Sequence, residues 1–200
     1  MKKIIILLII IIPTIVFSGW NYVGDPGFSA GAISMTQIAI GSDEHPVVAY
    51  RNSTFDENLW SLTVMKYNGT DWVILGDPFI HAGTITAMSM AVDNSGVPHL
   101  AYMDEINGSK GLVTRFNGTS WDTLGVDYFS DSWINTVSLA FDANDNAYVA
   151  YGDGSNSGYT TVKKYNGTAW VTVGSAGFST EATNIIDLAF DNSGANPLPI

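Results

Sequence analysis

Apolar and polar positions alternate along most of the chain with the period of a β-strand, interrupted at short intervals by Gly, Asn, Asp and Pro. Stretches such as "SLAFD", "YVAYG" and "TTVKKY" show this alternation, and each is followed by a turn sequence such as "ANDN" or "YNGT". Alternation over about four to eight residues predicts half-buried strands, because successive side chains of a strand point to opposite faces. No stretch beyond residue 18 has the period of an amphipathic helix, so we expect an all-β fold.

The same order of strands and turns recurs along the chain. Its clearest marker is a Trp followed four residues later by Gly, and the marker tryptophans are spaced 52, 49 and 49 residues apart: Trp20, Trp72, Trp121 and Trp170. Each full unit predicts four short antiparallel strands, with the Trp strand fourth. An Asn-Gly pair at 68–69, 117–118 and 166–167 precedes this strand and favours a tight hairpin. Such a two-residue hairpin places Lys66 opposite Asp71 and Met65 opposite Trp72.

Repeated four-stranded units of this length predict a β-propeller, in which the units are blades around a central axis. Small residues recur where blades would converge, at one position of the first strand and one of the second: Ala39, Ala91, Ala140 and Ala189, then Ala49, Ala101 and Ala150. One loop position is always large and apolar, which indicates a plug between blades: Phe28, Ile80, Phe129 and Phe178. The alternative is a pair of β-sandwich domains, whose strands have no reason to repeat so closely.

The units predict three full blades of about 49 residues, at about 33–75, 84–124 and 133–173. A further blade starts at residue 183, and residues 20–24 form a lone fourth strand of the kind that closes a ring. We therefore expect residues 19–200 to form an open or incomplete propeller, as the N-terminal part of a longer protein. If the chain ends at Ile200, its exposed strand edges and apolar faces would favour self-association.

The unit "SLAFDANDNAYVAYGD", continued by "TTVKKYNGTAWVTVG", resembles the repeats of secreted bacterial β-propeller proteins, with a loose likeness to kelch-type and sialidase-type blades. The resemblance covers residues 20–200 and implies the fold. It departs from both named types. The Gly-Gly pair of kelch repeats is absent, and the turns such as Asp93 to Gly96 have one residue too many for the sialidase Asp-box and lack its Trp. A recurring Trp-Asp signature, as in other propellers, is also missing, so no exact family follows.

Residues 1–18 have the pattern of a secretory signal peptide. Lys2 and Lys3 precede an unbroken apolar run from Ile4 to Ile12, and Val16 and Ser18 supply the small residues of a cleavage site. The apolar stretch is shorter than the roughly 20 residues of a membrane-spanning helix. We therefore expect export and cleavage, with the mature protein secreted or at the cell surface and not inserted in the membrane. The chain has no Cys, so it contains neither disulfides nor a lipid-modified cysteine anchor.

The chain is acidic, with a formal net charge of −11. This argues against nucleic acid and anionic membranes as partners, because phosphate binding needs clustered Lys and Arg. Solubility of an exported protein accounts for the charge.

Candidate binding residues are those that break the repeat on one face of the predicted propeller. His81 stands where other units have Ser, and Trp133 stands where they have Ala or Thr. On the same face, the loops after the second strands and between the blades add Asp104, Glu105, Tyr128 and Asp153. Aromatic rings beside carboxylates suit sugars, since rings stack on apolar sugar faces and carboxylates accept hydroxyl hydrogen bonds. Ordinary loop variation is the alternative explanation.

Catalytic patterns are weaker. A sialidase-like site needs several Arg, and the chain has only Arg51 and Arg115, the second of which is typical of an exposed cross-strand charge. Its three histidines, His45, His81 and His99, have no nucleophile or metal motif around them. A pair of catalytic carboxylates remains open. No cofactor is predicted: Asp142 to Asn146 has oxygen ligands that suit calcium but is too short for an EF-hand loop of about 12 residues, and turn chemistry accounts for it.

The leading hypothesis is a secreted, non-catalytic propeller that binds a glycan or a protein partner at the cell surface. One alternative is the propeller portion of an extracellular glycan-processing hydrolase or lyase. Another is a structural spacer of a surface adhesin.

Overall fold

The computed structural model describes residues 19–56, 59–77, 80, 85–125 and 127–190. These residues form three antiparallel sheets of four strands, each sheet built from consecutive strands. The first sheet contains β1 (Ile33–Ile40), β2 (Pro46–Asp56), β3 (Leu59–Tyr67) and β4 (Trp72–Ile74). The second contains β5 (Met88–Val92), β6 (Pro98–Asp104), β7 (Lys110–Phe116) and β8 (Trp121–Thr123). The third contains β9 (Ile134–Phe141), β10 (Ala147–Asp153), β11 (Tyr159–Tyr165) and β12 (Trp170–Thr172).

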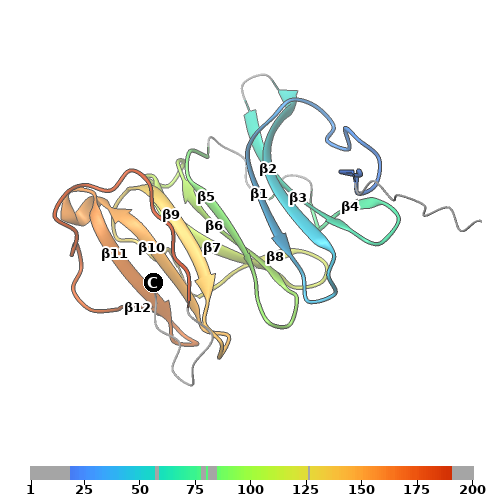
Figure 1. Cartoon of the computed structure of the whole chain (residues 1–200). Helices are drawn as coiled ribbons and strands as arrows, with labels where there is room; N and C mark the ends of the chain where they lie inside the picture. Colours follow the sequence, from blue (N-terminus) through green and yellow to red (C-terminus); the bar gives the residue numbers. More distant parts are fainter. Residues whose placement is uncertain (1–18, 57–58, 78–79, 81–84, 126, 191–200) are drawn as a thin grey trace, which may run out of the picture.

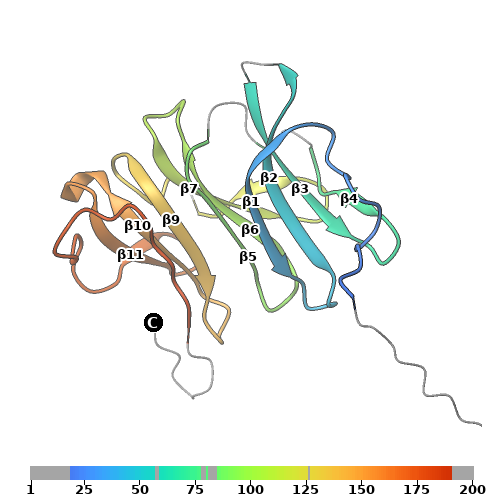
Figure 2. The same ribbon diagram turned by 45° about the horizontal axis from the view of Figure 1, so that its top comes forward.

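The three sheets stand side by side in chain order and do not close into a ring within the described residues (Figures 1 and 2). The first strands of neighbouring sheets lie together, since β5 contacts both β1 and β9. The predicted all-β fold, an open propeller of four-stranded antiparallel blades, is therefore confirmed.

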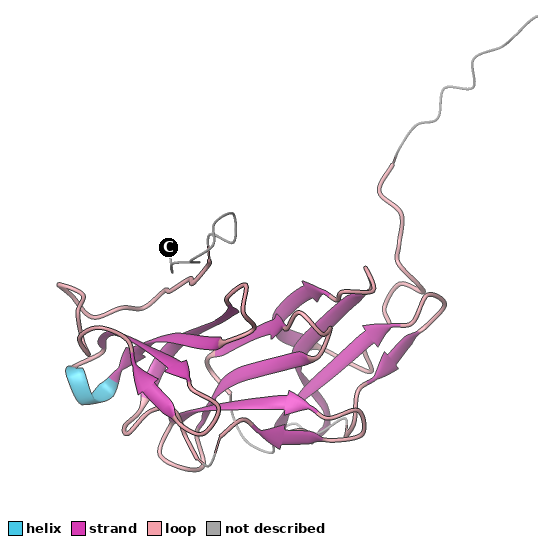
Figure 3. Ribbon diagram, turned by 90° about the horizontal axis from the view of Figure 1, so that it is seen from below, coloured by secondary structure: helices cyan, strands magenta, loops and turns pink. Residues whose placement is uncertain are grey.

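Helix is nearly absent from the described part of the chain. Figure 3 shows one short helical turn, the 3-10 helix η1 (Gly154–Asn156), between β10 and β11. The carboxylate of Asp153 begins this turn by accepting a hydrogen bond from the backbone N–H of Ser155 at 3.0 Å. None of the helical structure seen in the described ranges is long and apolar enough to span a bilayer.

Apolar side chains fill the space between successive sheets. One core cluster joins the first two sheets and another joins the second and third. The recurrent alanines of the second strands, Ala49, Ala101 and Ala150, are buried, in keeping with little room between blades. At the apolar loop position, Phe129 plugs the junction between blades as predicted. Its ring is buried, and the ring centres of Phe129 and Tyr151 are 5.1 Å apart.

The predicted hairpin register is wrong by two residues. Lys66 pairs with Val73, Met65 with Ile74, and Tyr67 with Trp72. A type I′ turn needs positive φ at both central residues, but of the pair only Gly69 has it, with a φ of 100°. Instead the Asn68 side chain accepts hydrogen bonds from the backbone N–H groups of Thr70 and Asp71, at 2.9 and 2.8 Å. These bonds lengthen the connection between the two strands.

Candidate functional site

The loops that follow the second strands and the loops that link the sheets lie on the same side of the row of three sheets. We call this side the loop face. The link between the second and third sheets brings Tyr128 to the end of β6, where its hydroxyl donates to Asp104 Oδ2 at 2.8 Å. The same link brings Trp133 to the end of β10, where its carbonyl accepts from the Gly154 N–H at 2.9 Å. Four of the predicted site residues therefore lie on connected loops of one face. Glu105 is exposed beside them, and His81 lies outside the described residues.

The two predicted aspartates are buried and hold their own loops. Asp104 accepts from the side chain of Asn107 at 2.6 Å in addition to Tyr128. Asp153 accepts from the side chain of Asn156 at 2.8 Å and from the Thr161 hydroxyl at 2.9 Å. Buried carboxylates need such partners. These aspartates therefore hold the loops of the loop face in position from their buried side.

The phenol of Tyr128 is fixed in its protonated form. Burial, together with the hydrogen bond to Asp104 and the negative charge there, raises the pKa of Tyr128 to about 12. At neutral pH the hydroxyl therefore remains a donor to Asp104. The hydroxyl of Tyr128 is therefore occupied by Asp104, and the ring is the part that contacts Lys110.

Trp133 is a large aromatic residue exposed on this face, with 43% of its surface accessible. Its ring lies against the loop after β10, where a Cβ on Gly154 would come within 2.6 Å of the indole. Trp133 also pairs with Lys110 in an isolated antiparallel bridge, and Lys110 Nζ lies 5.7 Å from the centre of the Tyr128 ring. The indole is therefore held against the loop after β10, while the backbone next to it pairs with Lys110, whose ammonium lies over the Tyr128 ring. Lys110 was not predicted, because only the fold brings the start of β7 next to Trp133.

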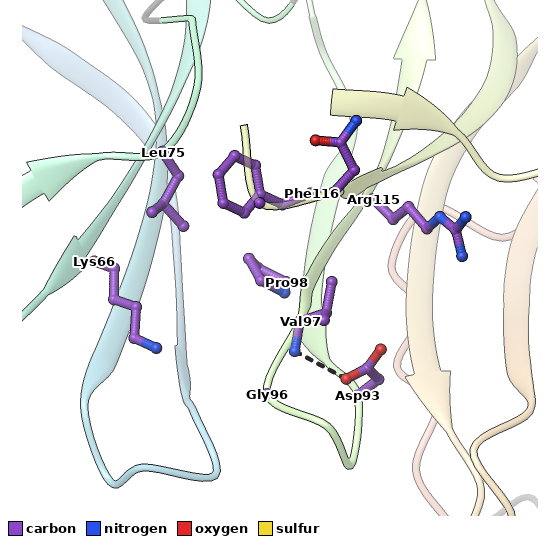
Figure 4. Close-up of a pocket in the computed structure, with 10 residues that line it drawn as sticks. Lys66, Leu75, Asp93, Gly96, Val97, Pro98, Arg115 and Phe116 are labelled. Carbon is purple, nitrogen blue, oxygen red and sulfur yellow. Dashed lines mark hydrogen bonds between the residues drawn. The ribbon is translucent and has the colours of Figure 1, made fainter. Parts of the chain in front are cut away.

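The opposite ends of the strands form the turn face, made of the Asn-Gly turns and the turns between first and second strands. A groove of about 580 Å³ opens there between the first and second sheets. Figure 4 shows Lys66 and Leu75 on one side of it and Pro98 and Phe116 on the other. Lys66 is held by Asp43, with Nζ 2.8 Å from Oδ2. Asp93, Arg115 and Asn117 also line this first groove, and the rest of its walls consists of apolar residues and glycines.

Within the described ranges, no three His, Asp or Glu side chains gather closely enough to hold a metal ion. Asp142, at the start of the stretch considered for calcium, uses its carboxylate in the turn. It accepts from the backbone N–H groups of Asn144 and Asn146, both at 2.9 Å, and from the Asn146 side chain.

Comparison with known proteins identifies a fold and no family. No family model matches the chain, and no curated protein matches it. Among solved structures, a protein of unknown function from Dyadobacter fermentans is similar over 78% of this chain and 58% of its own, with 14% identity and a TM-score of 0.51.

Two other solved structures are more distant. A fucose lectin from Kordia zhangzhouensis, in complex with methyl-fucoside, is 12% identical over 71% of this chain and 99% of its own, with a TM-score of 0.44. A polysaccharide lyase described as a PL25 ulvan lyase is 14% identical over 70% of this chain and 43% of its own, also with a TM-score of 0.44. At these identities the similarity concerns the fold alone.

Proposed function

We propose that this protein is an exported, non-catalytic propeller module that binds glycans at or outside the cell through its loop face. The observation that carries the proposal is the exposed indole of Trp133, held against Gly154, on a segment whose backbone pairs with Lys110, with the Lys110 ammonium over the Tyr128 ring. A flat aromatic ring with one open face suits the apolar face of a sugar, and a neighbouring ammonium donates to hydroxyl or acidic groups. The apolar leader in residues 1–18 supports export.

Binding is favoured over catalysis by the state of the carboxylates. Glycoside hydrolysis uses two carboxylates that face the scissile bond. Asp104 and Asp153 instead direct their oxygens to Asn, Thr and Tyr donors of their own loops. A partner protein rather than a glycan would use the same exposed aromatic surface, and the experiment below separates the two.

A glycan array with the 200-residue chain tests the proposal. We expect the wild type to bind a defined group of glycans, and Trp133→Ala to weaken that binding by about tenfold or more, which corresponds to about 1.4 kcal/mol. Lys110→Ala should weaken it less. The matched control is Trp20→Ala, which removes another exposed indole outside the loop face and should leave binding unchanged.

Circular dichroism melting of each variant shows whether lost binding reflects unfolding. A wild type that binds no glycan on the array, or a folded Trp133→Ala variant with unchanged affinity, would contradict the proposal. Retained capture of a protein partner with an empty glycan array would favour the alternative of a protein-binding module.

A further inference from the structure

A second groove lies on the turn face, between the second and third sheets, at the place that corresponds to the first groove one repeat earlier. It has a volume of about 360 Å³, within the range of small-ligand pockets. Leu124 takes the place of Leu75, and Arg115 takes the place of Lys66. The far wall differs more, since Asp145, Asn146 and Tyr165 replace Gly96, Val97 and Phe116. The repeat thus forms the same groove twice, once mainly apolar and once polar.

The floor of this second groove contains a buried histidine with an unused acceptor. His99 is 4% exposed, and its Nδ1 lies 3.0 Å from the carbonyl oxygen of Val97. A carbonyl only accepts, so Nδ1 carries the hydrogen and Nε2 has a free lone pair. No group in the described ranges donates to Nε2. Val47 occupies the matching position of the first sheet, so this acceptor is specific to the second groove.

Arg115 stands directly beside His99, as its cross-strand partner on β7. In the first groove Asp43 neutralises Lys66, but the residue that matches Asp43 in the second unit is Ser95. No carboxylate in the described part of the chain lies within ion-pair distance of Arg115. Figure 4 shows its side chain pointing away from Lys66 and Leu75. Arg115 lines both grooves, and its guanidinium, directed away from Lys66 and Leu75, is an available donor at the second groove.

The remaining walls combine acceptors, a donor and apolar surface. Asp145 accepts from the Asn94 N–H at 2.9 Å through Oδ1, which anchors this carboxylate across the junction between the sheets. Asn166 uses Oδ1 within its own turn, and its Nδ2 has no partner among the described residues. Leu124 and the Tyr165 ring supply apolar surface.

We infer that this second groove is a separate binding site for a neutral sugar residue of a glycan. Sugar hydroxyls both donate and accept, which matches the guanidinium of Arg115 beside Nε2 of His99 and the carboxylate of Asp145. The apolar surface of Leu124 and Tyr165 suits the C–H face of the sugar ring. Anionic sugars are disfavoured by the carboxylates of Asp93 and Asp145, and cationic ligands by Arg115.

This inference goes beyond the proposed function, because the site is on the opposite face from Trp133 and uses none of its residues. With both sites occupied, the module would present sugars in two directions and crosslink glycan chains. Burial also keeps His99 neutral by lowering its pKa, which preserves Nε2 as an acceptor.

The test is an NMR titration of the ¹⁵N-labelled 200-residue chain with D-glucose, D-galactose, D-mannose and, as a charged probe, sodium D-glucuronate. At least one neutral sugar should shift the amide signals of Asn146, Asn166 and Gly167. Arg115→Met should weaken this binding at least fivefold, and His99→Leu should weaken it further. The matched control is Lys66→Met in the first groove, which should leave the titration unchanged.

Arg115 is exposed, so its variant keeps the inference falsifiable if the buried His99 variant does not fold. Absence of shifts at these amides with every neutral sugar, shifts that Arg115→Met leaves unchanged, or binding of glucuronate alone would overturn the inference. Trp133→Ala should retain the groove shifts. A wild type that binds glycans through Trp133 but shows no groove shifts would reject this site and leave the proposed function standing.

Discussion

The indole Nε1 of Trp121 donates a hydrogen bond to the backbone carbonyl of Leu75 at 2.8 Å, from the fourth strand of one blade to the end of the fourth strand before it. The same bond recurs from Trp170 to Leu124 at 3.1 Å, and from Trp72 to Val23 at 2.8 Å. The repeated Trp therefore connects each unit to its predecessor. A backbone carbonyl at the edge of one blade, which would otherwise lack a donor, receives a hydrogen bond from the next blade.

Replacing Trp121 by Phe should lower the free energy of unfolding by about 1 to 2 kcal/mol, because the Leu75 carbonyl loses its donor and the smaller ring leaves part of the junction unfilled. Urea denaturation followed by circular dichroism measures the change. Trp20→Phe is the control, since Trp20 is exposed and should change stability little. Equal effects of the two substitutions would show that the hydrogen bond does not couple the blades.

The repeat predicted the fold well, because local alternation and turn residues determine a four-stranded antiparallel sheet. It failed at the register of the hairpins. The Asn-Gly pair suggested a two-residue turn, but the side chain of Asn68 competes for the backbone N–H groups of Thr70 and Asp71. Sequence spacing alone does not show which of these two turn chemistries is preferred.

Site residues were predicted less completely, because their roles depend on neighbouring blades. Asp104 was assigned to the loop face, but its burial under Tyr128 follows only from the packing of a loop 24 residues away in the chain. His99 was passed over because no motif surrounds it, and Arg115 was assigned as an exposed cross-strand charge. The useful clue was a comparison of the first and second units. Val47 of the first unit corresponds to His99 of the second, and Asp43 corresponds to Ser95, so the second unit gains an acceptor and loses a counter-ion.

Gly111 lies under the plug residue of the second junction, and Gly111→Ala should be destabilising by about 1 to 3 kcal/mol. A Cβ there would overlap the Phe129 ring. The backbone has little freedom to move away, because the Phe129 N–H donates to the Gly111 carbonyl at 2.8 Å and the Gly111 N–H donates to Ser130 Oγ at 2.8 Å.

Differential scanning calorimetry would show this loss as a lower melting temperature. Gly19→Ala is the control, because a Cβ at Gly19 meets no atom within 4 Å. A Gly111→Ala variant as stable as the control would mean that Phe129 moves out of the junction at little cost.

Two buried threonines should respond oppositely to the same substitution. The Thr114 hydroxyl is buried without a hydrogen-bond partner among the described residues. Thr114→Val should therefore be neutral or stabilising by up to about 1 kcal/mol, since it removes an unsatisfied polar group at nearly constant volume. Thermal melting monitored by circular dichroism is sufficient to detect this.

Thr161 is the contrast. Its hydroxyl donates to Asp153 at 2.9 Å and accepts from the Gly177 N–H at 2.9 Å. Thr161→Val should cost about 1 to 3 kcal/mol, because it leaves a buried carboxylate and an N–H group without this partner. If Thr114→Val is the more destabilising of the two, Thr114 has a hydrogen bond in solution that this arrangement lacks.

The stability of the protein should fall in mildly acidic solution through His99. Burial lowers the pKa of His99 below its ordinary value of 6.5, and the positive charge of Arg115 acts in the same direction. The hydrogen bond to Val97 and the carboxylates of Asp93 and Asp145 oppose this shift without cancelling it. The unfolded chain therefore binds a proton at His99 more readily than the folded chain. The stabilisation is present above pH 6.5 and is lost as the pH falls from there through the folded-state pKa.

Urea unfolding at pH 7.5, 6.5 and 5.5 tests this, with the wild type compared against His99→Gln. The difference between the two proteins isolates His99, because every other titrating group is common to both. The free energy of unfolding of the wild type should decrease more steeply between about pH 6.5 and 5.5 than that of the variant. Parallel decreases, or an NMR titration that places the His99 pKa of the folded protein at or above 6.5, would contradict the prediction, because burial would then not favour the neutral imidazole.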